Sequence, residues 1–112
     1  MLAAAHRQAA EDIEQGVQRL QNPQVPRLII EGAWGASFHW IAYGCQTKHQ
    51  KHQESHKRLP AFLRNQGEPI VAELWNNIDH VRQGGWYGQG TEEDQVQRAL
   101  DLLDNIRNWA LA

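Results

Sequence analysis

The sequence predicts an all-α fold, an antiparallel up-and-down four-helix bundle with a short extra helix. Apolar residues recur at three- and four-residue steps in several long segments, and no segment shows the sustained alternation of a half-buried strand. Proline and glycine stand between these segments, where helices are expected to begin and end. We expect residues 1–112 to form a single domain.

The first expected helix precedes Asn22-Pro23 and is about five turns long. Proline disfavours a helical residue before it and lacks the amide that a continuing helix needs, so the helix stops there. Apolar residues three and four apart form its inward stripe: Ala9, Ala10, Ile13, Val17 and Leu20. We expect its acidic residues, Glu14 among them, to lie on the outward face.

The second expected helix begins after Pro26 and runs from about residue 27 to His49 or beyond. It carries two apolar stripes, one through Trp34 and another through Trp40. A helix that is apolar on two sides must be covered twice. We predict that the rest of the domain covers one side and that a second copy of the chain covers the other, giving a homodimer through the second helix.

Three further helices complete the predicted fold. Ser55 is expected to cap a short third helix that ends before Gly67. The fourth helix should begin at the Glu-Pro step at residues 68–69 and end at the glycine pair at 84–85. Thr91, followed by three acidic residues, is a good N-terminus for the last helix.

The formal net charge of −2 offers no global attraction to nucleic acid, and the 41% apolar content is that of a soluble globular protein. The longest uncharged run is interrupted by glycine and polar residues, which argues against a membrane span. The N-terminus has no apolar segment long enough for a signal peptide, so we expect a cytoplasmic protein. Cys45 has no partner in the chain and should be a small core residue. We expect no cofactor.

Four segments, taken in order, resemble the HEPN domain family of small all-helical prokaryotic domains. They are the amphipathic opening helix, the run EGAWGASFHWIAYG, the segment SHKRLPAFL and the turn RQGGWYG. The positions that carry the resemblance are Phe38-His39, Ser55-His56 with Leu59 and Phe62, and Arg82 with Tyr87. The resemblance implies a dimerising helical bundle, often encoded with a nucleotidyltransferase partner, and in many members a metal-independent ribonuclease that acts as a toxin.

The ribonucleases of that family carry an arginine followed, after four to six residues, by a histidine. This sequence departs from the pattern, because no histidine lies at that distance after an arginine and none follows His80. The resemblance therefore points to a non-enzymatic dimer that binds a nucleotide, RNA or a partner protein such as a nucleotidyltransferase.

We place the candidate ligand site in a cleft lined by basic, aromatic and histidine side chains. Its predicted members are Arg82, Trp86, Tyr87, His39, His56, Lys57 and Arg58. The basic residues follow a stretch rich in lysine and can meet phosphate, while the arginine and the two aromatic residues of the glycine-rich turn can stack on a base. Alternatively, the same two aromatic residues plug the end of the bundle.

Two other hypotheses use the histidines. In the first, His39 or His56 acts with Arg82 as a non-standard ribonuclease site. In the second, His49, His52 and His56 bind a metal ion, because an unbroken helix would place residues at this spacing along one side. Four neighbouring basic residues repel a cation from that helix face, and we predict no metal ligand there.

Overall fold

The computed structural model describes residues 2–20, 25–85 and 91–112, and these residues form helices and no strands. The helices are α1 (Ala3–Arg19), α2 (Pro26–His49), α3 (Leu59–Asn65), α4 (Pro69–His80) and α5 (Glu92–Leu111). A π-type turn, Val81–Gly85, continues α4. The predicted all-α class is confirmed. Of the helices in these ranges, none is both long and apolar enough to cross a membrane.

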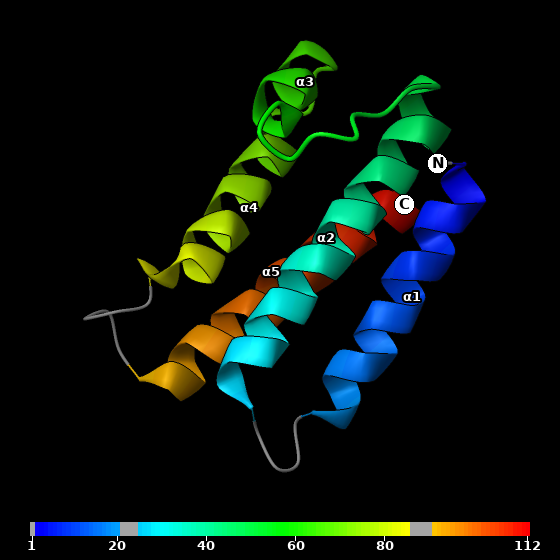
Figure 1. Ribbon diagram of the computed structural model, residues 1–112. Helices are drawn as coiled ribbons and strands as arrows, with labels where there is room; N and C mark the ends of the chain where they lie inside the picture. Colours follow the sequence, from blue (N-terminus) through cyan, green and yellow to red (C-terminus); the bar gives the residue numbers. More distant parts are fainter. Residues whose placement is uncertain (1, 21–24, 86–90) are drawn as a thin grey trace.

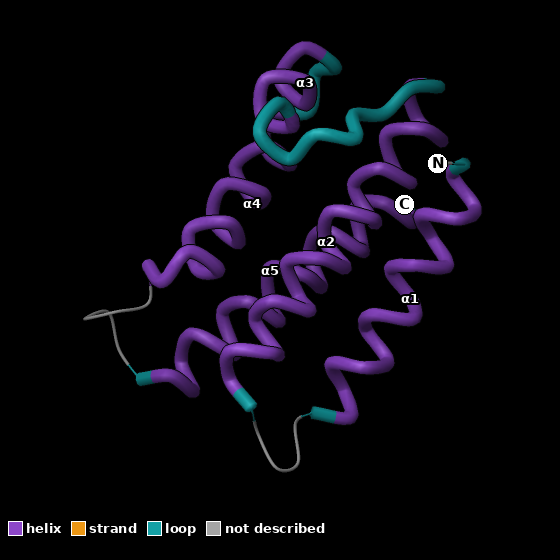
Figure 2. Tube along the Cα trace, in the orientation of Figure 1, coloured by secondary structure: helices purple, strands orange, loops and turns teal. Residues whose placement is uncertain are grey.

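The four longer helices alternate in direction along the chain (Figure 1). Helix α2 packs against α1, α4 and α5, with α1 on one side of it and α4 on the other. The segment that leaves α2 crosses the end of the molecule to reach α3, which lies on the first turn of α4 (Figure 2). Residues from these five helices meet in a common hydrophobic core, whose largest fully buried side chains are Trp40 and Trp75.

Both apolar sides of α2 are covered by the chain itself. A Cβ atom on Gly32 would collide with Val17 of α1, and one on Gly44 would collide with the Trp109 side chain of α5. Ala36, one turn before Trp40 on the second stripe, is completely buried. Helices α1, α4 and α5 of the same chain therefore pack against both apolar stripes of α2, and the homodimer through α2 stays a prediction.

The helix ends follow local chemistry. Thr91 Oγ1 accepts a hydrogen bond from the Asp94 amide at 3.1 Å, and the Asp94 carboxylate accepts one from the Thr91 amide at 3.1 Å, so the predicted start of α5 is a complete capping box. Gly84 has a φ of 89°, a left-handed conformation that ends the π-type turn after α4. Gln50, the residue that follows α2, has a left-handed φ of 59°.

Two local predictions were wrong. Ser55 does not cap α3, because that helix begins at Leu59 and Arg58 occupies the cap position without a side-chain hydrogen bond. Glu14 does not face outward, because its carboxylate accepts hydrogen bonds from Trp40 Nε1 of α2 and from Arg107 Nη1 of α5. The Glu14 carboxylate points inward because two hydrogen-bond donors from distant parts of the chain, on α2 and α5, bind it there.

Candidate functional site

Residues 50–58 form the connection that builds the candidate site. The chain leaves α2 through the left-handed Gln50 and passes over the end of the molecule before the turn at residues 56–58. In this turn the His56 ring lies edge-on to Trp34 and Phe38, with ring centroids 5.0 and 5.5 Å apart. The turn therefore places His56 above the side of α2 that faces α4.

A cleft of about 150 Å³ opens between this turn and the end of α4. Its lining residues are His56, Lys57, Asp79, Arg82 and Gln83. Three of them, His56, Lys57 and Arg82, are predicted ligand-binding residues that come from two segments far apart in the sequence. The structure brings these three together, while Asp79 and Gln83 are members that the sequence alone did not suggest.

Trp34 holds the cleft in place. The Arg82 guanidinium carbon lies 4.0 Å from the centroid of the Trp34 ring, close enough for a cation–π interaction. Trp34 Nε1 donates a hydrogen bond to Asp79 Oδ1 at 2.9 Å, and Gln83 Nε2 donates one to Asp79 Oδ2 at 2.7 Å. Both oxygens of Asp79 are thereby used within the protein, and the guanidinium is held over the indole ring.

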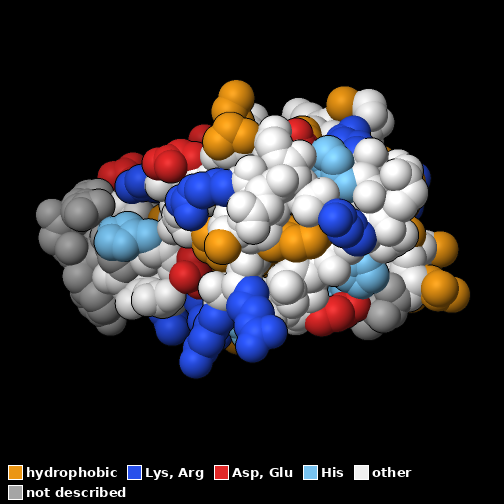
Figure 3. All heavy atoms as spheres, turned by 90° about the horizontal axis from the view of Figure 1, so that it is seen from above, with side chains coloured by type: hydrophobic (Ala, Val, Ile, Leu, Met, Phe, Trp, Pro, Cys, Tyr) orange, Lys and Arg blue, Asp and Glu red, His pale blue; other side chains and the backbone are white. Residues whose placement is uncertain are grey.

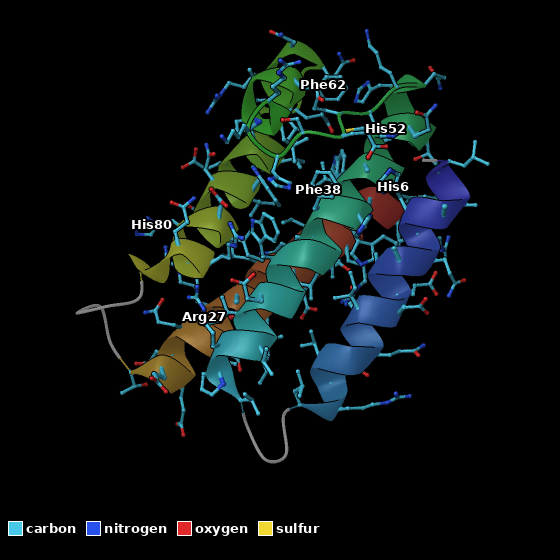
Figure 4. The ribbon with its side chains drawn as sticks, in the orientation of Figure 1. His6, Arg27, Phe38, His52, Phe62 and His80 are labelled. Carbon is cyan, nitrogen blue, oxygen red and sulfur yellow. The ribbon has the colours of Figure 1, made fainter. Side chains whose placement is uncertain are left out.

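The charges around Arg82 are partly balanced. Arg82 Nε donates to Glu31 Oε2 at 3.3 Å, and Arg27 forms an ion pair with Glu31 at 3.5 Å. Arg27 Nη1 also donates to the Arg82 carbonyl oxygen at 3.0 Å, which sets a second cation beside the cleft, from the first turns of α2 (Figure 4). An arginine four residues before a glutamate was the available sequence signal for the Arg27–Glu31 pair.

The surface around the cleft carries mixed charge. Figure 3 looks onto the α3 end of the molecule and shows Lys and Arg side chains in separate groups, with histidine and acidic side chains between them. Lys57 and Arg58 are both exposed at this end. Any attraction to an anion is therefore local, as the net charge of −2 requires.

His39 is on a different side of α2. Its Nδ1 lies 2.8 Å from His6 Nδ1 of α1, and it is absent from the lining of the cleft. Burial lowers the pKa of His39, and the neighbouring His6 lowers it further. Arg58 also lies outside the lining, at the start of α3. Trp86 and Tyr87, the two predicted stacking residues, lie outside the described residues.

The three histidines proposed as a metal site do not converge. Helix α2 ends at His49, so no unbroken helix carries the three side chains along one face. His49 Nε2 faces Glu68 at 3.9 Å, His52 contacts Gln46 and Glu54, and His56 packs on aromatic rings. A different group, made of His6, His52 and Glu54, has its ligand atoms close together.

Cys45 and His80 lie outside the cleft. Cys45 is buried, and burial raises the pKa of its thiol to about 12, so it is a core residue and no nucleophile at neutral pH. His80 is exposed on the outer side of α4 (Figure 4).

A larger hollow, of about 420 Å³, lies between the first turns of α4 and the C-terminal part of α5. Its surroundings are mostly apolar, and Ile70 at its edge is 77% exposed. Glu68, its acidic member, already accepts a hydrogen bond from Trp109 Nε1 at 2.6 Å. Size alone would select this hollow, yet it lacks the converging polar groups that bind a charged ligand.

No family model, curated protein or solved structure matches the chain significantly.

Proposed function

We propose that this chain is a non-enzymatic HEPN-like domain, an antiparallel up-and-down four-helix bundle with a short extra helix, that binds RNA. The observation that carries the proposal is the shared cleft of His56, Lys57 and Arg82. These residues were selected from the sequence for phosphate and base contacts, and the fold places them within one concavity. A lysine, an arginine and a histidine edge together match the chemistry of a phosphodiester backbone.

The dimensions favour a strand over a free nucleotide. Pockets that enclose small molecules usually have volumes of about 300–1,000 Å³, whereas this cleft holds about 150 Å³. A phosphate or the edge of a base fits such a space, and the rest of the RNA strand would lie across the protein surface. The guanidinium of Arg82 has five N–H donors, and its Nε–H is directed to Glu31, so the Nη groups can meet phosphate.

Anisotropy of a short labelled single-stranded RNA tests the proposal. Arg82→Gln and Lys57→Gln should weaken binding, and each should reduce the slope of log affinity against log salt by about 0.7 per lost phosphate contact. Arg98→Gln is the matched control, because Arg98 is an exposed residue of α5 outside the cleft. Equal RNA affinity in all three variants would sink the proposal. If a mononucleotide displaces the labelled RNA completely, the ligand of the cleft is a nucleotide and not an RNA strand.

The family resemblance also leads us to propose a homodimer and a nucleotidyltransferase partner. Because Ala36 is completely buried, a charge there would unfold the chain and not test a dimer. Leu28 is a better probe, because it belongs to α2 and is 54% exposed. Sedimentation at micromolar concentration should show a dimer that Leu28→Glu dissociates with helical content unchanged. A monomeric parent protein would contradict the homodimer.

A ribonuclease is the second candidate function, and one observation narrows it. His56 shares the cleft with Arg82, whereas His39 contacts His6 on another side of α2. Of the two predicted histidines, His56 is therefore the one placed to act with the arginine. RNA cleavage that is lost in His56→Gln and kept in His39→Gln would support an enzyme. Intact RNA after incubation with the parent protein would exclude it.

A further inference from the structure

A second cluster of chemically active side chains lies near the N-terminal end of α1. There the segment that follows α2 brings His52 next to His6 (Figure 4). Glu54 Oε1 lies 3.1 Å from His6 Nε2 and 2.7 Å from His52 Nε2. The ligand atoms of the three side chains all lie within 4.8 Å of one another.

We propose that His6, His52 and Glu54 bind one divalent transition-metal ion of the zinc type. The ligands are Nε2 of each histidine and a carboxylate oxygen of Glu54. Two imidazoles and one carboxylate are a common zinc donor set, and three protein ligands leave a coordination position for water or another ligand.

The distances fit with small side-chain movements. Zinc binds nitrogen and oxygen at about 2.0–2.2 Å, so ligand atoms around a tetrahedral ion are about 3.3 Å apart. The two contacts of Glu54, at 3.1 and 2.7 Å, are already near that separation. The rings of His6 and His52 meet edge to face with centroids 4.9 Å apart, which leaves their Nε2 atoms directed to the same carboxylate.

The outer nitrogens of both histidines have partners suited to metal ligands. His52 Nδ1 lies 2.8 Å from Gln46 Oε1, an acceptor, so Nδ1 can carry the proton while Nε2 binds metal. His6 Nδ1 lies 2.8 Å from His39 Nδ1, which can accept the same kind of hydrogen bond. Partners of this kind orient a ligating imidazole and select its tautomer.

The surroundings also favour the ligating forms. His6 is completely buried, and its burial lowers its pKa, so the ring stays neutral as a ligand requires. Hydrogen bonding from His52 contributes most to lowering the pKa of Glu54 to about 2, so the carboxylate is ionised at neutral pH. These shifts agree with the geometry, which alone carries the proposal.

This site differs from the one considered from the sequence. That hypothesis grouped His52 with His49 and His56, which the structure separates, and it left out His6 and Glu54. The new site is also independent of the proposed RNA contact, because the cleft around Arg82 shares none of its ligands.

Calorimetry tests the proposal directly. Protein freed of metal with a chelator is titrated with Zn²⁺, and one ion per chain is expected. His52→Ala and Glu54→Gln should abolish binding. These positions are chosen because their side chains are 14% and 53% exposed, so the variants can fold without the metal. His49→Ala and His80→Ala are the matched controls and should bind as the parent does.

A fourth variant separates orientation from ligation. His39→Phe removes the partner of His6 Nδ1 but no ligand, and loss of such a partner costs about 10- to 100-fold in metal affinity. Titration with Co²⁺ should give visible absorption bands of a low-coordinate nitrogen and oxygen site in the parent and in His49→Ala. The proposal is overturned if Zn²⁺ gives no heat, or if the His52→Ala variant, shown to be folded by circular dichroism, binds as tightly as the parent.

Discussion

Two histidine-bearing regions flank α2, and they differ in how they are built. In the cluster of His6, His52 and Glu54, imidazole nitrogens converge on one carboxylate, and one ring is fully buried. In the cleft of His56 and Arg82, the histidine meets aromatic rings and the cation is paired with Glu31. The first is an arrangement of lone-pair donors and is the proposed metal site, and the second combines two cations with an acidic residue and is the proposed phosphate contact.

The same short connection supplies both regions. His52 and His56 are four residues apart, and on a helix they would share a face. Because α2 ends at His49, the connection is free to turn, and it directs His52 to α1 and His56 to Trp34. The end of α2 thus separates His52, a proposed metal ligand, from His56, a proposed RNA contact.

The largest effect is expected from Trp34→Ala. Trp34 supports Arg82, packs on Trp75 and donates a hydrogen bond to Asp79. Its loss should lower the free energy of unfolding by about 3 kcal/mol, the lower end for removal of a large aromatic side chain, because Trp34 is only half-buried. Urea denaturation measures this change. RNA affinity should fall, whereas zinc affinity should stay the same; an equal loss of zinc binding would show that the two regions are coupled.

His6→Ala should produce the next largest effect, on the opposite side of α2. It leaves His39 without its partner and opens space in the core, at a cost of about 2 kcal/mol in the presence of a chelator. Urea denaturation measures this loss, and calorimetry should show that zinc no longer binds. RNA anisotropy should be unchanged. A variant with the parent's urea midpoint would contradict the structural role of His6.

Acid should destabilise the histidine cluster first. Burial is the main cause that lowers the pKa of both His6 and His39 from 6.5, while Glu54 opposes this shift and His52 adds to it at His6. The unfolded chain therefore binds more protons than the folded one below pH 6.5. We expect the urea midpoint to be constant above this pH and to fall as the pH decreases through the lowered values.

His39→Gln should reduce the fall of the urea midpoint below pH 6.5, and His80→Asn is the control that should leave it unchanged, because His80 is exposed.

A second decrease of the urea midpoint should appear at lower pH. The pKa of Glu54 is depressed from 4.5 to about 2, so its contribution is complete above pH 4.5 and is lost as the pH falls to about 2. A midpoint that rises on acidification from neutral pH would contradict the assignment to the buried histidines, and one that stays constant between pH 4.5 and about 2 would contradict the assignment to Glu54.

Lys57→Ala should give the smallest effect. Lys57 is exposed, so its loss should change the free energy of unfolding by less than about 0.5 kcal/mol. The salt dependence of RNA affinity should fall by about one phosphate contact, a slope of roughly 0.7. Lys51→Ala, an exposed lysine outside the cleft lining, is the control for charge alone. If Lys57→Ala and Lys51→Ala give the same salt slope, Lys57 makes no phosphate contact in the cleft.

Most helix boundaries could be predicted because their signals are local. Pro26 and Pro69 mark the first residues of α2 and α4, and Thr91 with Asp94 forms the predicted cap of α5. The failure at Ser55 has an equally local reason. Arg58 already takes the cap position of α3 without a side-chain bond, so no capping residue is used there.

The site could be predicted only in part. His56, Lys57 and Arg82 were identified by residue type and were found together, but Asp79 and Gln83 carry no sequence signal that separates them from other polar helix residues. His6 had a signal that was missed. It lies four residues before Ala10, on the apolar stripe of α1, where a buried polar side chain requires a partner.

By itself, the sequence determined the helices and their inward faces, since spacing, proline, glycine and capping residues act over a few residues. Only the tertiary structure decided which side chains from distant segments meet. Glu14 turned inward because Trp40 and Arg107 supply donors, and both apolar stripes of α2 are packed by three helices of its own chain. Such pairings depend on how helices pack, and a local pattern does not encode them.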